Sequence, residues 1–133
     1  MPIPTELFAT IVAPIATASG QEPATEAIRV WQTLFRKFGP LLGPLSTELL
    51  FARSLAIHTP QYPWLPRIAP AAARTAFAEF ERILAARAPE DIVAVNHALL
   101  ASYTKGLLDL IGAGLTTKLL AAAFPDDKTN TQP

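Results

Sequence analysis

The longest apolar segment of the sequence limits what the chain can fold into. On a helical wheel, residues 90–123 place apolar side chains over a wide arc and leave only a narrow polar stripe. The arc contains Ile92, Val95, Leu99, Leu100, Tyr103, Leu107, Leu108, Leu110, Ile111 and Leu115. A helix of this kind has to be surrounded by other helices on most sides. The expected fold class is therefore all-α, a compact bundle of about five helices.

This segment is also too long for the domain that contains it. An unbroken helix over residues 90–123 would be about 50 Å long, whereas a compact domain of this size is only about 36 Å across. Either the helix bends at Gly106 or in Gly112-Ala113-Gly114, or one end projects and packs on a second copy. We favour a kink or break near Gly112 and Gly114. Pro89 suits the first position of this helix, and Asn96, inside the apolar arc, is expected to be hydrogen-bonded.

Four further helices are expected upstream. The clearest covers residues 24–38, where Trp31 is a core residue and Gly39-Pro40 supplies the stop. The next covers residues 47–58, with Ser46 as its cap, and much of it should be buried because its apolar face is broad. An alanine-rich, peripheral helix follows at residues 71–87. The domain is predicted to span residues 1–124 and the polar tail 125–133 to be disordered.

The N-terminal segment has two interpretations. Its apolar stretch ends in small residues, as a secretory signal does, but it lacks a basic start and carries Glu6 and Pro14. We favour an amphipathic helix that Thr5 caps, with Ile11 and Ile15 among its inward residues. Export is therefore not the expected interpretation.

Charge and composition exclude several classes of partner. The 11 basic and 11 acidic residues cancel, so no long-range field collects phosphates, and nucleic acid is not an expected partner. A surface that is poor in charge and has no net charge favours self-association, so a homo-oligomer is expected. Residues 107–124 are long enough to suggest a membrane span, but Asp109 and Lys118 lie inside them, and we expect no membrane span.

Few residues suggest chemistry. The chain has no cysteine, and His58 and His97 lie on different predicted elements without a ligand at helical spacing, so neither a metal nor a cofactor is expected. The sequence lacks the motifs of nucleophilic hydrolases, phosphate-binding loops and zinc proteases. An enzymatic function is therefore not expected.

A few polar residues on the two most apolar helices are the candidate ligand-binding site. Glu48, Arg53, Lys105 and Asp109 could be a solvated stripe or an ion pair, because Lys105 and Asp109 are four residues apart. Alternatively they could anchor a small apolar or amphipathic ligand in a cavity beside Tyr103.

The stretch HTPQYPWLPRIAP, residues 58–70, contains two overlapping PxxP units. Such units can form a polyproline helix that another protein recognises, with Tyr62 and Trp64 as the partner-binding residues. The alternative is a stiff strap whose aromatic side chains pack over the bundle, and we favour it because a docking peptide would not leave Trp64, Leu65 and Ile68 in solvent.

Three pieces of the chain, LLGPLSTELLFARSLAI, YPWL and LLDLIGAGLTTKLL, resemble an uncharacterised family of small all-helical bacterial domains, over about residues 41–121. The family often has IGExLT where this chain reads IGAGLT at 111–116, so a carboxylate is missing at Ala113. If that carboxylate pairs with the arginine that matches Arg53, the pair is absent here. The resemblance implies a bacterial cytoplasmic protein and suggests no reaction.

Two functions follow from these patterns. The first is a non-enzymatic, self-associating helical module that binds a partner protein through an exposed part of its apolar helix surface. A contiguous exposed apolar patch would favour it. The alternative is a binder of a small apolar or amphipathic ligand between helices.

Overall fold

The computed structural model describes residues 5–17, 22–66 and 73–124, and these form helices and turns without a strand. The helices are α1 (Thr5–Ala16), α2 (Glu22–Leu42), α3 (Pro44–His58), α4 (Ala73–Leu84), α5 (Pro89–Ile111) and α6 (Ala113–Ala123). The all-α bundle is thus confirmed. One more helix is present than predicted because the last helical region is split in two. The predicted tail, 125–133, lies outside the described residues.

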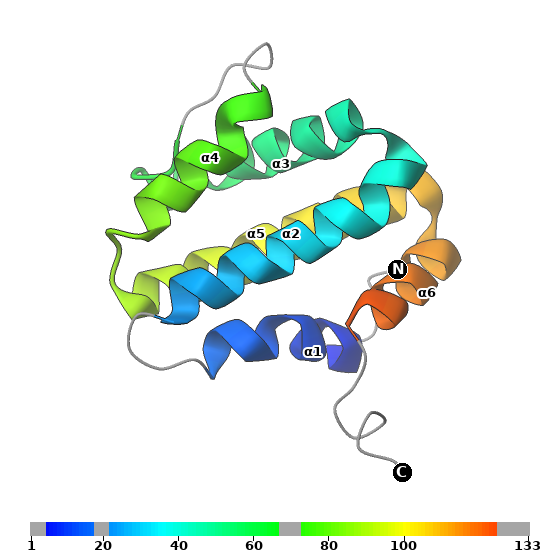
Figure 1. Cartoon of the computed structure of the whole chain (residues 1–133), viewed down its shortest axis with the longest axis horizontal. Coiled ribbons are helices and arrows are strands. Elements are labelled where there is room, and N and C mark those ends of the chain that lie inside the picture. Colours follow the sequence, from blue (N-terminus) through cyan, green and yellow to red (C-terminus); the bar gives the residue numbers. More distant parts are fainter. Residues whose placement is uncertain (1–4, 18–21, 67–72, 125–133) are drawn as a thin grey trace.

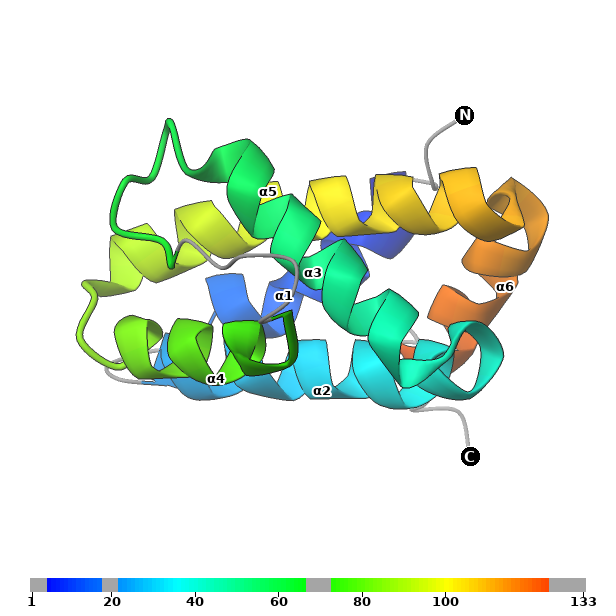
Figure 2. The ribbon, with the colours of Figure 1, turned by 90° about the horizontal axis from the view of Figure 1, so that it is seen from above.

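The six helices form three layers. In Figure 1 the two longest helices, α2 and α5, run side by side through the middle, with α3 and α4 on one side and α1 and α6 on the other. Figure 2 shows the same molecule from the side of α3 and α4, and α3 crosses α5 at an angle. The central pair is therefore covered on both faces, as the wide apolar arc of α5 requires.

The core is built around the indole ring of Trp31 on α2. Phe51 of α3, Phe80 of α4 and Tyr103 of α5 contact this ring edge to face, with centroids 4.9 to 6.5 Å away. The indole Nε1 donates a hydrogen bond of 2.8 Å to Oδ1 of Asn96 on α5. Asn96 in turn donates from Nδ2 to the Ile92 carbonyl at 2.7 Å. The predictions that Trp31 is a core residue and that Asn96 is hydrogen-bonded are both confirmed.

Single glycines make the two sharpest turns. Gly43, between α2 and α3, has φ 94° and ψ 146°, and Gly112, between α5 and α6, has φ 88° and ψ 158°. This region of backbone conformation is open essentially to glycine alone. The predicted break near Gly112 is confirmed, and so is the start of α5 at Pro89.

Gly106 has a different role. A Cβ atom at this position would collide with the side chain of Leu50 on α3, whereas no atom lies within 4 Å of a Cβ built at Gly114. Gly106 therefore lets α3 pass close over α5, and α5 continues through it to Ile111.

The boundary between α2 and α3 differs from the prediction, and α4 ends at Leu84 instead of at residue 87. Helix α2 continues through Gly39-Pro40 to Leu42, and α3 begins at Pro44 instead of at Thr47. Pro40 cannot donate a backbone hydrogen bond, but the Gly43 N–H beyond it still donates to the Gly39 carbonyl at 2.7 Å. Ser46 consequently lies inside α3 and does not cap it, and Pro44 occupies the first turn.

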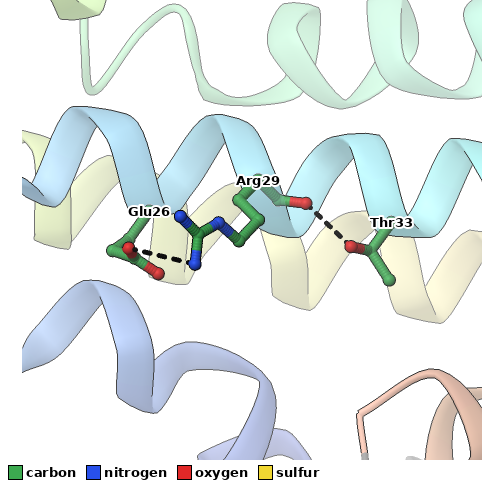
Figure 3. A network of polar contacts seen from close by, with 3 residues as sticks. All are labelled: Glu26, Arg29 and Thr33. Atoms are coloured by element: carbon green, nitrogen blue, oxygen red, sulfur yellow. Dashed lines mark hydrogen bonds and ion pairs between the residues drawn. The ribbon is translucent and has the colours of Figure 1, made fainter.

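The polar face of α2 carries a small network that stabilises the helix locally. Arg29 pairs with Glu26 at 3.6 Å, and the Thr33 hydroxyl donates to the Arg29 carbonyl at 2.9 Å (Figure 3). An exposed ion pair of this kind contributes about 0.5 kcal/mol or less. The network therefore marks the solvent side of the helix and offers no site.

The Trp31–Asn96 bond can be tested by a double-mutant cycle. Replacing Asn96 with Leu leaves the indole N–H buried without an acceptor, so the free energy of unfolding should fall by about 1–3 kcal/mol. Trp31→Phe removes the donor, and the double variant should therefore lose about 1 kcal/mol less than the two single losses together. Urea denaturation gives all four values. Strict additivity would show that the hydrogen bond does not couple the two helices.

The backbone role of Gly112 is tested against Gly114. Gly112→Ala should lower the free energy of unfolding by about 1–3 kcal/mol, because alanine is strained at this φ and ψ. Gly114→Ala, two residues further inside α6, should be neutral or stabilising by up to about 1 kcal/mol. Equal effects in thermal or chemical denaturation would contradict the assignment of the corner to Gly112.

Candidate functional site

Large apolar side chains that remain in water gather at one end of the bundle. In the described part of the chain, six have 39–58% of their surface exposed, and five of them flank the Gly43 and Gly112 corners. Both corners lie at the right-hand end of the molecule in Figures 1 and 2. We call this surface the leucine end; its members are Leu41, Leu45, Leu49, Leu110 and Leu115. The sixth side chain, Ile57, lies at the other end of α3.

The exposure of these leucines has two structural causes. Leu110 lies two turns after Tyr103 on the same face of α5, yet Tyr103 is fully buried and Leu110 is 58% exposed. The core-facing side of α5 thus extends beyond the helices that cover it. Leu45 and Leu49 instead belong to the outer face of α3, where Ala56 and Ile57 are exposed too. The expectation that much of α3 is buried is therefore wrong for this face.

The leucine end is free of charge at its centre. Residues 38–47 and 110–117 contain no acidic or basic side chain. Charged residues of both signs flank these segments: Arg36, Lys37 and Glu48 on one side, and Lys105, Asp109 and Lys118 on the other. An apolar centre with a mixed polar rim is the usual organisation of a protein–protein contact surface.

Burial of this surface would release considerable free energy. Covering one exposed leucine completely contributes about 1.5–3 kcal/mol. Because the five leucines are each about half exposed, their complete burial by a partner would contribute roughly 5 kcal/mol on this side alone. Outside the leucine end, Ile57 is the only large apolar side chain among the described residues that is exposed to this extent.

Glu48, at the edge of the leucine end, has an unsatisfied carboxylate. Its Oε2 atom is enclosed and has no hydrogen-bond partner among the described residues. Glu48 directly precedes Leu49 in α3 and is half-buried. An enclosed oxygen without a donor costs free energy, because its water has been removed without replacement.

The residues predicted to bind a small ligand are not together on the inside. Arg53, Lys105 and Asp109 are all exposed, and none belongs to an ion pair in the described part of the chain. Tyr103 is buried in the aromatic core, its hydroxyl has no partner there, and burial raises the pKa of the phenol well above its ordinary value. Of the four predicted residues only Tyr103 therefore lies inside the bundle, and the small-ligand function stays a prediction.

The strap is described up to Pro66. Leu65 and Pro66 are buried, and Tyr62 and Trp64 are half-buried and pack against the core. The guanidinium of Arg87, after α4, lies 4.6 Å from the centre of the Trp64 ring, a cation–π contact. This part of the stretch is therefore used within the fold, in agreement with the strap interpretation. Ile68 lies outside the described residues.

His58 joins the end of α3 to α5. Its Nε2 lies 2.6 Å from Oγ of Ser102 in a partly buried position, and this burial lowers the pKa of the imidazole. Among the described residues, no three His, Asp or Glu side chains are grouped as metal ligands. None of the described helices is both long and apolar enough to cross a membrane.

Comparison of the chain with models of protein families, with curated proteins and with solved structures finds no match. The resemblance to small helical bacterial domains therefore stays a prediction, and so does a bacterial cytoplasmic origin. Ala113, where that family often has a carboxylate, is the exposed first residue of α6.

The leucine end was not predicted as a site. Two signals in the sequence point to it: the uncharged segments 38–47 and 110–117, and the apolar residues on every side of α3. Neither signal separates a buried surface from an exposed one, because exposure depends on where the neighbouring helices end.

The lowered pKa of His58 predicts a pH-dependent stability. His58 binds a proton near pH 6.5 in the unfolded chain and only at lower pH in the folded chain. The stability that neutral His58 contributes is therefore complete above pH 6.5 and is lost as the pH falls through the pKa of the folded state. When the pH is lowered from about 8 to about 5, the free energy of unfolding of the wild type should therefore fall relative to that of His58→Gln. Urea denaturation measures it. A difference that does not change with pH would contradict the prediction.

Proposed function

We propose that this chain is a non-enzymatic helical module that binds another protein surface through its leucine end. The observation that carries the proposal is the concentration of five exposed leucines around two uncharged helix corners at one end of the bundle. Apolar patches of this kind on otherwise well-packed domains commonly mark protein-interaction sites.

The organisation of the fold supports this role. The aromatic core around Trp31 is enclosed by the three layers, whereas the leucines at the corners are not part of it. The leucine end can therefore lose or gain a partner without a change in the core. Helices α2, α3, α5 and α6 all contribute to it, so it is fixed by several elements at once.

Site-specific photo-crosslinking tests the proposal. A benzophenone amino acid at position 45 or 110 of the full chain, expressed in its own source cells, should crosslink to protein on irradiation. The matched control is position 57, because Ile57 is 57% exposed and Leu110 58% exposed, but Ile57 lies away from the leucine end. Crosslinked protein at positions 45 and 110 and little at 57 is the expected result. Equal yields at all three positions, or none, would overturn the proposal.

A further inference from the structure

We infer that the partner of the leucine end is a second copy of this chain, held in a twofold-symmetric dimer. The inference rests on the proposed function, because it names what that surface binds. In a twofold contact the same patch of both copies is used, so a residue on one side meets the complementary residue on the other. The patch must therefore be complementary to itself, in shape and in charge.

The charges around the leucine end meet this condition. The rim residues carry both signs, with Glu48 and Asp109 among four basic residues, and so can pair across a twofold axis. A partner of one strong charge would instead favour a rim of the opposite sign. Because the chain has no formal net charge at pH 7, two copies also approach without overall repulsion.

The area of the leucine end shows what else a stable dimer interface has to contain. Five half-exposed leucines amount to roughly 400 Å² of apolar surface, within the range of the largest patch on a typical monomer. A standard stable interface buries about 800 Å² on each partner. The leucines thus supply about half, and the uncharged residues of the two corners and the rim have to supply the rest. We expect a reversible dimer in the micromolar range, which closes at two copies because the twofold contact uses the leucine end of both.

The composition of the C-terminal residues 125–133 makes them a poor candidate to cover the leucine end. They read PDDKTNTQP and contain no large apolar side chain that could cover a leucine. A second copy brings five leucines to the same surface, so each side supplies what the other needs.

Sedimentation velocity over a concentration series tests the inference. Between about 1 μM and about 1 mM, where reversible interfaces of this size dissociate, the wild type should change from the 14.3 kDa chain to twice that mass. Leu45→Glu and Leu110→Glu should each raise the dimer dissociation constant by about a hundredfold or more, because the new carboxylate is buried twice in a symmetric contact. Ile57→Glu is the matched control and should leave the constant within about threefold.

Crosslinking through an introduced cysteine is a second test of the dimer, and it applies even if a glutamate variant fails to fold. The natural chain has no cysteine, so Leu110→Cys and Ile57→Cys each carry one thiol. A short bis-maleimide should link two copies through position 110 and not through position 57. Circular dichroism melts of every variant show whether its fold is retained.

The outcomes separate this inference from the proposed function. The second copy is overturned as the partner if the wild type stays monomeric over the whole concentration range. It is also overturned if neither leucine variant weakens the dimer and a thiol at position 110 does not link two copies. In the photo-crosslinking experiment, a product of twice the chain mass supports it, and a product with a different protein overturns it while leaving the docking surface in place. The proposed function itself fails if no crosslinked product is specific to positions 45 and 110.

Discussion

The hydrogen bond from Trp31 to Asn96 fixes the relation of the two central helices, and the other layers are built on that pair. An amide in an otherwise apolar helix face has to find a partner, and an indole N–H enclosed by aromatic rings has to find an acceptor. Each satisfies the other at 2.8 Å, and the second half of the amide is satisfied by the backbone of its own helix. Sliding α2 along α5 by even one turn would leave both groups buried and unpaired. The bond therefore selects one register from several that apolar contacts alone would allow.

Aromatic rings extend this register to the outer layers. Phe51 and Phe80 bring α3 and α4 against the Trp31 ring, and Phe77 and Phe35 continue the same edge-to-face contacts. The strap reaches the bundle through Leu65 and through the contact of Arg87 with Trp64. Specific ring geometry, together with one buried hydrogen bond, thus makes the packing of these helices unique.

Much of this fold could be predicted from the sequence because it depends on local chemistry. The break at Gly112, the start at Pro89, the core position of Trp31 and the need of Asn96 for a partner all follow from residue type and helical period. The extension of α2 through Pro40 could not be predicted, since it depends on whether bonding resumes beyond the proline. The site was less predictable than the fold. Exposure of Leu110 is decided by where the neighbouring helices end, and the periodicity of α5 is the same for a covered and an uncovered leucine.

The separation of the leucine end from the aromatic core has a consequence for how such a protein can change over generations. The leucines at the corners add less to folding than the core residues do, since about half of each side chain is in water, while the rings around Trp31 tolerate few replacements. Replacements of these leucines, unlike those of Gly43 and Gly112, can therefore accumulate without loss of the folded state. One lineage could keep self-recognition and another acquire a new partner, with the same bundle beneath both.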